Sequence, residues 1–381
     1  MYDVVVVGAG LAGCVMAERM ATRAGKRVLV VEKRHHIGGN CYDEMRDGIR
    51  VHRYGPHLFH TDDAEVWRYL SAFTAWEPYE HRVLAHIDGH DVELPFNLTS
   101  LYRLFPEGTA RRIEAALVER YGVDADVPVL ELKKSDEPLL RQLAETVYEK
   151  VFKHYTAKQW GLLPEEIDAS VTARVPVRTG KENRYFRDRY QAVPKEGYAT
   201  MFERMLAHPR IGVLSGTDAG DILALDETGG IHLFGQPFEG MVIYTGMVDA
   251  LFGYRFGALP YRSVEMVFET KPVAVFQPAA TVNYPNAHDF TRITEFKHIH
   301  PADVRHTVIL KEYPGPFEPG KNEPYYPFFT EEAQALHRTY ADYAQRYDSL
   351  VLLGRLAEYR YYDMDDMVRR ALDTFGELDN G

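Results

Sequence analysis

Residues 4–32 read VVVVGAGLAGCVMAERMATRAGKRVLVVE, and this stretch decides the fold. A run of valines leads into Gly8, Gly10 and Gly13, a helix-compatible segment follows, and a second apolar run ends at the acid Glu32. In a strand-helix-strand unit of this kind, the first glycine makes a tight turn, the second lets the backbone approach a pyrophosphate, and the third packs helix against strand. The helix N-terminus faces the phosphates, and the terminal acid binds the ribose hydroxyls. The stretch therefore predicts a βαβ unit that binds an adenine dinucleotide.

A second pair of glycines indicates which dinucleotide binds. Residues 32–40 read EKRHHIGGN, which places Gly38 and Gly39 after the acid, where a second close approach of the backbone to the cofactor would require residues without side chains. FAD enzymes commonly carry such a pair, whereas simple NAD domains do not need it. A plain turn is the alternative for the pair taken alone. Its position after Glu32 favours FAD.

Composition excludes several classes of protein. The chain has 381 residues, of which 45% are hydrophobic, enough for two or three cooperating domains. Its formal net charge of −12 argues against general nucleic-acid binding. Two cysteines, Cys14 and Cys41, suggest neither a disulfide framework nor a metal cluster. No apolar run reaches membrane-spanning length and the start lacks a basic n-region, so we expect a cytoplasmic protein.

Hydrophobic periodicity along the chain predicts a discontinuous α/β architecture. Helical patterning dominates 92–170, including an amphipathic segment at 139–153, and a strand-helix return follows at 197–214. A last strand at 350–354 and a helix from about 365 to 375 complete the first domain. The fold class is therefore α/β, with a discontinuous FAD-binding Rossmann-like βαβ domain, an inserted helical domain and an antiparallel β-sheet domain.

The predicted domain boundaries follow from this pattern. The FAD-binding domain takes residues 1–75, 197–257 and 340–381, and the helical domain takes 92–172. The remaining segments form the β-sheet domain that binds the substrate, with a mobile lid near 172–184; they are 76–91, 173–196 and 258–339.

Seven further segments carry more specific patterns. They are YGPHLFHT at 54–61, HYTAKQWG at 154–161, TARVPVRTGKENRYF at 172–186, TVNYPN at 281–286, TRITEFKH at 291–298, EPYYP at 323–327 and GRLAEYRYYDMD at 354–365. In this order, over nearly the whole chain, they resemble UDP-galactopyranose mutase, a bacterial flavoenzyme family that interconverts UDP-galactopyranose and UDP-galactofuranose. The stretch 226–240, DETGGIHLFGQPFEG, is longer than the corresponding family turn, and a surface hairpin is the simplest explanation.

The resemblance implies an isomerase without net redox chemistry. In this family reduced FAD is a covalent catalyst: flavin N5 attacks the anomeric carbon as UDP leaves, the flavin-sugar adduct opens and recloses through the other hydroxyl, and UDP returns. The family also implies an external reductant such as NAD(P)H or reduced flavin, a homodimer or higher homo-oligomer, and a product that supplies galactofuranose for cell-surface glycans.

Two arginines are the candidates for binding the diphosphate, and we assign both a catalytic role. The leaving pyrophosphate gains negative charge, and the guanidinium groups of Arg174 and Arg292 match phosphate oxygens bidentately. Arg174 lies in a polar, basic segment whose Gly180 permits movement, so we expect it on the lid. A solvated surface charge is the alternative for either arginine taken alone.

The resemblance also assigns side chains to the uridine and the phosphates. Phe152, Tyr155 and Trp160 are expected around the uracil and the lid, with Thr156 in the same motif. A second set comprises the phosphate-binding tyrosines and an amide assigned by motif alone: Tyr185, Tyr326, Tyr361 and Asn283. Because the chain has 25 tyrosines, a core role is the alternative for any single one.

The cofactor residues come from the two glycine motifs, the GPHLFH motif and the C-terminal motif. They are Gly8, Gly10, Gly13, Glu32, Lys33, Gly38, Gly39, Asn40, His57, His60, Arg355, Asp363 and Met364. By resemblance His60 lies near flavin N5 and acts in catalysis, and Arg355 meets the pyrophosphate. The helix beginning near Met364 would aim its amides at the flavin pyrimidine edge. Asp363 either caps that helix or contacts substrate.

Three alternatives remain for these residues. His57 and His60 could form a metal pair, but no Cys or acidic partner with ligand spacing accompanies them, so we expect no metal. A conventional FAD oxidoreductase of the amine-oxidase or glutathione-reductase kind would share the βαβ unit, although no second glycine motif for NAD(P) is found. A non-enzymatic flavin- or nucleotide-binding protein would not need the arginines and aromatics of the mutase motifs.

Overall fold

A five-stranded parallel sheet forms the base of the molecule, with strand order β12-β2-β1-β16-β22. The computed structural model describes residues 2–161 and 176–379. The strands are β1 Val4–Val7, β2 Val28–Glu32, β12 Ile211–Ser215, β16 Met241–Tyr244 and β22 Leu350–Leu352. All four valines of β1 are buried, because a central parallel strand is covered on both faces. The predicted βαβ unit and last strand are confirmed.

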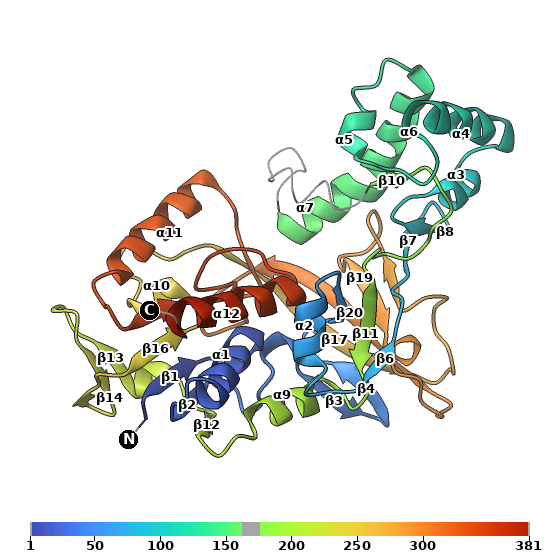
Figure 1. Ribbon diagram of the computed structural model, residues 1–381. Coiled ribbons are helices and arrows are strands. Elements are labelled where there is room, and N and C mark those ends of the chain that lie inside the picture. Colours follow the sequence, from blue (N-terminus) through green and yellow to red (C-terminus); the bar gives the residue numbers. More distant parts are fainter. Residues whose placement is uncertain (1, 162–175, 380–381) are drawn as a thin grey trace.

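Alternating side chains of β1 point into two separate cores. Val4 and Val6 pack under three helices on one face, where α1 and α12 lie side by side (Figure 1). Val5 and Val7 pack on the other face against hairpin strands and two helices. The helices of the first face are α1 Leu11–Thr22, α9 Tyr198–Leu206 and α12 Met364–Asp379. Those of the second face are α10 Val248–Leu251 and α11 Glu331–Ala344, with strands β13 Leu223–Leu225, β14 Ile231–Leu233 and β15 Gln236–Pro237. The last three form the hairpin expected at 226–240.

A seven-stranded, mostly antiparallel sheet lies beside the parallel sheet, with order β21-β17-β20-β19-β18-β7-β8. Its strands are β7 Val83–Ile87, β8 His90–Leu94, β17 Tyr261–Lys271, β18 Thr281–Asn283, β19 Arg292–Glu295, β20 Thr307–Pro316 and β21 Tyr326–Pro327. Asp88 and Gly89 both have positive φ, 50° and 80°, which suits the tight turn of a hairpin. Residues 92–94, which we predicted in the helical domain, therefore belong to this sheet.

Helices cover the β7–β8 end of that sheet (Figure 1). They are α3 Leu98–Leu104, α4 Glu107–Tyr121, α5 Val129–Leu132, α6 Pro138–Val147 and α7 His154–Trp160. The predicted amphipathic segment at 139–153 is helical, but its last part, Tyr148–Lys153, winds as a π-helix. Such wide turns occur often at functional sites. Leu140, Leu143 and Val147 anchor α6 in a core shared with the two strands below.

Further short strands form separate sheets of two or three strands. They are β3 Asp43–Arg46, β4 Ile49–His52, β5 Phe59–Thr61, β6 Trp76–Pro78, β9 Asp126–Val127, β10 Val177–Arg178 and β11 Tyr190–Pro194, with helix α2 Ala64–Leu70. β11 pairs with both β5 and β6, so the main chain crosses repeatedly between regions. The three-domain division stays a proposal, and its boundary at residue 340 falls inside α11.

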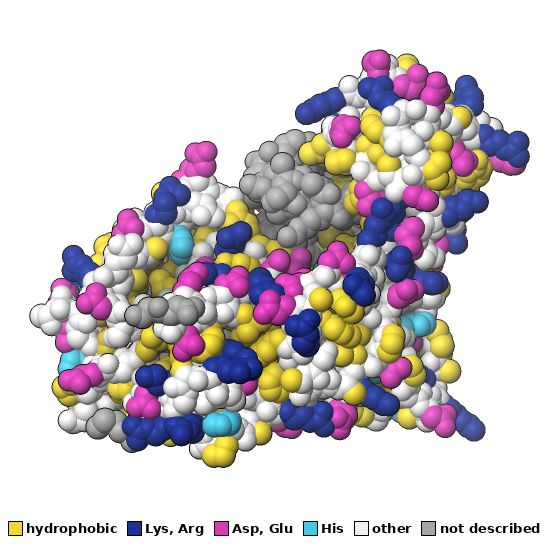
Figure 2. Space-filling view, in the orientation of Figure 1, with side chains coloured by type: hydrophobic (Ala, Val, Ile, Leu, Met, Phe, Trp, Pro, Cys, Tyr) yellow, Lys and Arg dark blue, Asp and Glu magenta, His cyan; other side chains and the backbone are white. Residues whose placement is uncertain are grey.

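Surface charge is mixed on the face drawn in Figure 2. There, Lys and Arg side chains are interspersed with Asp and Glu side chains over the described residues. None of the helices described here combines the length and the apolar character that crossing a membrane would require.

Gly13 offers a test of the packing between α1 and β1. We expect Gly13→Ala to lower the free energy of unfolding by about 1–3 kcal/mol, the usual cost of overpacking. The added methyl carbon would lie 1.9 Å from the carbonyl oxygen of Gly8. Urea unfolding measures the effect. Gly108→Ala in α4 is the control, because its methyl group meets no atom within 4 Å. Equal stability of Gly13→Ala and wild type would contradict the packing role.

Candidate active site

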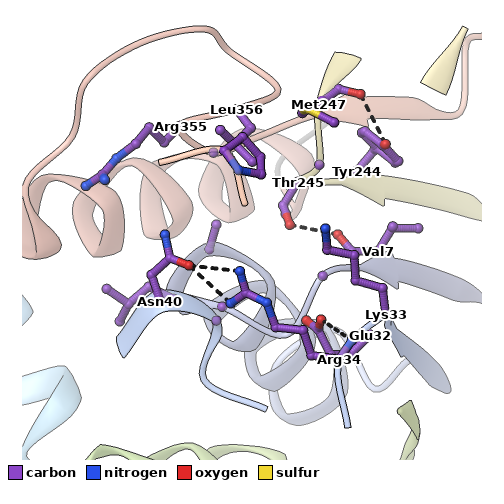
Figure 3. Close-up of a pocket in the computed structure, with 18 of the residues that line it drawn as sticks. Val7, Glu32, Lys33, Arg34, Asn40, Tyr244, Thr245, Met247, Arg355 and Leu356 are labelled. Carbon is purple, nitrogen blue, oxygen red and sulfur yellow. Dashed lines mark hydrogen bonds between the residues drawn. The ribbon is translucent and has the colours of Figure 1, made fainter. Parts of the chain in front are cut away.

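A cavity of about 400 Å³ opens where β1, β2 and β16 end and α1 begins. This is the edge of a parallel sheet at which nucleotides usually bind. Eleven of the thirteen predicted cofactor residues line it (Figure 3). They are Gly8, Gly10, Glu32, Lys33, Gly38, Gly39, Asn40, His57, Arg355, Asp363 and Met364.

The glycines of the two motifs contact one another at the floor of the cavity. Gly8 has φ of +100°, and a Cβ there would lie 2.1 Å from Thr245 Oγ1. A Cβ on Gly39 would lie 2.8 Å from the Cα of Gly10, so the two glycine turns touch through their backbones. Gly13 does not line the cavity, and its role is the helix-strand contact. The floor is therefore bare backbone, as a pyrophosphate requires.

Glu32 is held rigidly at the end of β2. Its Oε2 accepts a hydrogen bond from the backbone N–H of Ala9 at 2.8 Å, and its Oε1 accepts one from that of Arg34 at 2.9 Å. Each carboxylate oxygen has a second lone pair, and the side chain lines the cavity (Figure 3). Glu32 can therefore accept hydrogen bonds from the two hydroxyls of a ribose.

Arg355 links the cavity to the predicted phosphate-binding tyrosines. Its guanidinium carbon lies 5.4 Å from the ring centre of Tyr326 and 5.1 Å from that of Tyr361, and the two rings are stacked 6.1 Å apart. It also donates to the carbonyl oxygen of Tyr362 at 2.7 Å. The side chain is thus fixed between the dinucleotide cavity and the tyrosine pair.

Helix α12 begins at Met364, as predicted, and points its N-terminus at the cavity. The backbone N–H of Asp363 donates to Asp366 Oδ2 at 3.4 Å, and the carbonyl of Asp363 accepts from the N–H of Met367. Asp363 therefore occupies the cap position, while its side chain also faces the cavity. Both predicted roles, helix cap and substrate contact, are compatible with this placement.

Three adjacent strands bring Asn283, Arg292 and Glu312 side by side. Asn283 on β18 faces Arg292 on β19, and Arg292 faces Glu312 on β20. Arg292 Nε donates to Glu312 Oε1 at 2.7 Å. Burial disfavours the charge of Arg292, but the Glu312 carboxylate and the phenols of Tyr155 and Tyr326 together outweigh burial and raise the pKa of the guanidinium. Within the described part of the chain, the buried Oδ1 of Asn283 has no hydrogen-bond partner. A buried acceptor without a partner commonly indicates a binding site.

Tyrosine side chains gather around Arg292. The phenols of Tyr155 and Tyr326 interact electrostatically with Arg292, and Tyr185 interacts with Tyr155. Burial raises the pKa of Tyr155, so its hydroxyl stays protonated and can donate. His57 also lies close enough for Arg292 to affect its titration, and it lines the cavity. The predicted phosphate site and the cofactor cavity therefore adjoin.

His57 has a defined proton position. Its Nδ1 lies 2.8 Å from the carbonyl oxygen of Gly55, which can only accept, so Nδ1 carries the hydrogen. Burial lowers the pKa of His57 to about 4, so the ring is neutral at pH 7 and Nε2 is an acceptor. His57 can therefore accept a proton or a hydrogen bond at the cavity wall.

The remaining predicted residues are only partly brought together. Phe152 and Thr156 are buried, and Phe152 belongs to the core of the helical region. Trp160 ends α7, but its side chain lies outside the described residues, as does the whole of Arg174 together with the part of the lid before residue 176. The predicted uracil site is thus described only on the side of Tyr155.

His60 is the second predicted cofactor residue, besides Gly13, that does not line the cavity. It stacks on Phe186, with ring centres 3.6 Å apart, and its Nδ1 lies 3.3 Å from Asp188 Oδ1. Burial opposes protonation of His60, but the carboxylates of Asp188, Asp363 and Asp365 together outweigh it and raise the pKa of the imidazole.

The sequence analysis missed several residues of the site. Glu312 fixes Arg292, Thr245 fills the space beside Gly8, and Arg34 lines the cavity next to Glu32. His81 is fully buried near Arg292, and burial lowers its pKa to about 3. Only Arg34 had a usable signal, its position beside the ribose acid. Glu312 lies on β20, Thr245 directly follows β16, and His81 precedes β7, so these three reach the site through strand pairing that the sequence does not show.

Known proteins resemble this chain along its whole length. Residues 150–361 match the UDP-galactopyranose mutase family, and residues 6–73 match the NAD(P)-binding Rossmann-like domain. UDP-galactopyranose mutase of Mycoplasma genitalium is 35% identical, with 99% of this chain and 95% of the relative covered. dTDP-fucopyranose mutase of Escherichia coli is 30% identical, with 98% and 97% covered.

Solved structures show the same fold at lower identity. A crystal structure of reduced UDP-galactopyranose mutase superposes with a TM-score of 0.72 at 16% identity, covering 100% of this chain and 94% of that one. Putrescine oxidase bound to putrescine gives a TM-score of 0.57 at 13% identity, with 100% and 99% covered. The fold is therefore shared with both UDP-galactopyranose mutase and putrescine oxidase, and fold similarity alone does not separate the two. By the family match and the full-length relatives, the chain belongs to the UDP-galactopyranose mutase family of enzymes.

Proposed function

We propose that this protein interconverts UDP-galactopyranose and UDP-galactofuranose with FAD bound in the cavity at the edge of the parallel sheet. The observation that carries the proposal is the partly buried Arg292, fixed by Glu312 and surrounded by tyrosines, next to a dinucleotide cavity. An amine oxidase handles a cationic substrate, for which a fixed arginine at this place would be repulsive. A diphosphate is the chemistry that this cluster suits.

The cavity fits FAD. Its glycine floor leaves room for a pyrophosphate, Glu32 can take the ribose hydroxyls, and Arg355 adds a positive charge near the N-terminus of α12. In its reduced form, bound FAD would supply a nucleophilic nitrogen for the sugar. The positive end of the α12 dipole at the pyrimidine edge would favour the anionic form of the reduced cofactor.

The side chains around Arg292 would bind the diphosphate as its charge grows. Arg292 and, from the lid, Arg174 would supply charge-assisted hydrogen bonds to the phosphate oxygens. Neutral phenols of Tyr155, Tyr185 and Tyr326 would add hydrogen bonds without holding the anion too tightly. Because these interactions strengthen when the bond between sugar and phosphate breaks, they would stabilise the transition state more than the bound substrate.

Other groups would orient the nucleotide sugar. The Oδ1 of Asn283, for which no described residue is a hydrogen-bond donor, would accept a hydrogen bond from a sugar hydroxyl. His57 Nε2 would be a proton acceptor at the boundary between cofactor and sugar. Tyr361 beside Arg355 and Asp363 at the start of α12 would close the same side. Phe152, Thr156 and Trp160 would receive the uracil, and His60 would act near the flavin from behind this layer.

Several features of the proposal stay predictions. They are the cell-surface role of galactofuranose, a cytoplasmic location, the external reductant, and a homodimer or higher homo-oligomer. A related nucleotide sugar is the second candidate substrate, because the dTDP-fucopyranose mutase of Escherichia coli is similar over the full length. The sequence of this chain is less identical to that relative than to the UDP-galactopyranose mutases, which favours the UDP sugar as substrate.

Activity should require the reduced cofactor although no electrons reach the product. We expect dithionite reduction to switch on isomerisation of UDP-galactopyranose, with product far exceeding the reducing equivalents consumed. Chromatography of the nucleotide sugars measures turnover, and dTDP-fucopyranose serves as the competing substrate. Equal turnover by fully oxidised enzyme would rule out the mechanism. Faster turnover of the dTDP sugar would change the substrate that we assign and leave the mechanism as proposed.

Removal of Arg292 should weaken catalysis without loss of the cofactor. We expect Arg292→Ala to lower kcat about 10²–10³-fold, or roughly 3–4 kcal/mol, as for other single groups that stabilise a developing anion. Arg174→Ala should behave similarly. The visible flavin spectrum checks that FAD is retained, and Arg338→Ala on the exposed face of α11 is the control. A colourless Arg292→Ala protein would assign the residue to the cofactor instead.

A further inference from the structure

Two segments far apart in the sequence meet at one side of the cofactor cavity. Lys33 and Arg34 follow β2, and Glu323 lies in the loop between β20 and β21. Arg34 Nη2 donates to Glu323 Oε2 at 2.8 Å, and Lys33 Nζ lies 3.3 Å from the same oxygen. Lys33 and Arg34 line the cavity, as do the two residues that follow Glu323, Pro324 and Tyr325. The ion pair therefore ties together two walls of the cavity.

Arg34 is a rigid anchor for this connection. Its side chain is only 14% exposed, and both terminal nitrogens donate to Asn40 Oδ1 at 3.1 Å. Its guanidinium carbon lies 4.3 Å from the ring centre of Tyr54, a favourable cation-π distance. Burial disfavours the charge of Glu323, but Arg34 and Lys33 together lower its pKa. Burial also disfavours the charge of Arg34, but Glu323, with smaller contributions from Tyr54 and Glu32, raises its pKa. Both groups are therefore charged at neutral pH.

One donor of Arg34 is left for a ligand. The Nε atom is buried, and no described residue accepts a hydrogen bond from it. An N–H group in this state is costly unless something pairs with it. Because Arg34 lines the cavity beside Glu32 and Asn40, a phosphate or ribose oxygen of the cofactor is the partner whose chemistry fits.

The segment that carries Glu323 also reaches the diphosphate cluster. Three residues later, Tyr326 stacks on Tyr361 and interacts with Arg292. Between them, the carbonyl oxygen of Tyr325 lies 3.4 Å from Arg355 Nη1, and the N–H of Tyr325 donates to the carbonyl of Arg262 at 2.8 Å. Residues 323–326 thus have one end at the cofactor cavity and the other at the proposed substrate site.

We propose that Glu323 is a positioning residue that retains FAD by closing residues 323–326 over the cavity, and that UDP binding at Tyr326 tightens this closure. The coupling to UDP rests on the proposed function, whereas the retention of FAD does not. A ligand that stabilises one end of a short segment also favours the conformation of its other end. Linkage then requires that UDP slow the release of FAD and that FAD strengthen the binding of UDP.

FAD release tests the retention. We expect Glu323→Gln to release FAD about tenfold faster than wild type, measured as the rise in flavin fluorescence after large dilution. Glu323→Asp keeps the charge on a shorter side chain and should release it at an intermediate rate. Glu318→Gln is the matched control, because Glu318 lies in the same loop but pairs with Lys321, away from the cavity. Release from both Glu323 variants at the wild-type rate would overturn the proposal, as would equal acceleration by Glu318→Gln.

The effect of UDP on FAD release tests the coupling to UDP separately from the retention of FAD by Glu323. Saturating UDP should slow FAD release from wild type several-fold and from Glu323→Gln much less. Binding of UDP is measured separately by calorimetry on the FAD-loaded protein. Failure of UDP to bind would contradict the proposed function while leaving the faster release from Glu323→Gln intact. Binding of UDP with equal slowing in both proteins would overturn the coupling.

Discussion

Direct backbone contact between two glycine turns is the constraint on which the rest of the site depends. Gly10 and Gly39 approach so closely that a single Cβ on Gly39 would lie 2.8 Å from Gly10. This contact fixes the start of α1 against the segment after β2, and so fixes the positions of Glu32, Arg34 and Asn40. A flexible loop could not place these polar groups with the same accuracy. The contact between the two glycines therefore determines the geometry of charged side chains several residues away.

The positive charges at the site of this acidic chain are three arginines that local contacts hold in place, and they do not belong to an extended basic surface. Arg292, Arg34 and Arg355 are each held by fixed groups, namely the Glu312 carboxylate, the Asn40 amide with Glu323, and backbone carbonyls. A fixed cation needs little reorganisation when an anion arrives, and partial burial strengthens its field. Selectivity for a nucleotide sugar can therefore coexist with a formal net charge of −12.

The parts of the structure that were predictable from sequence are those coded by short-range patterns. The βαβ unit and the C-terminal helix follow from turn residues and periodicity, whereas the hairpin at 226–240 was expected because the stretch is longer than the family turn; the structure contains all three. Family motifs led to Arg292 and to the cavity-lining residues. Glu312 and Thr245 could not be found this way, because they act through pairing of strands distant in sequence. The start of the helical region was misplaced because the β7–β8 turn looks like any polar loop until both strands are seen to pair.

The ladder Asn283–Arg292–Glu312 carries a consequence for how this site can change over time. Neighbouring residues in a strand point to opposite faces, so a one-residue insertion or deletion within β19 would turn Arg292 away from both partners at once. The sheet could still form, but the proposed anion site would be lost rather than weakened. A change of length would therefore cost this site more in β19 than in the 284–291 connection that precedes it. The proposed activity therefore depends on an unchanged register of β18, β19 and β20, and a sequence that loses this register loses the site completely.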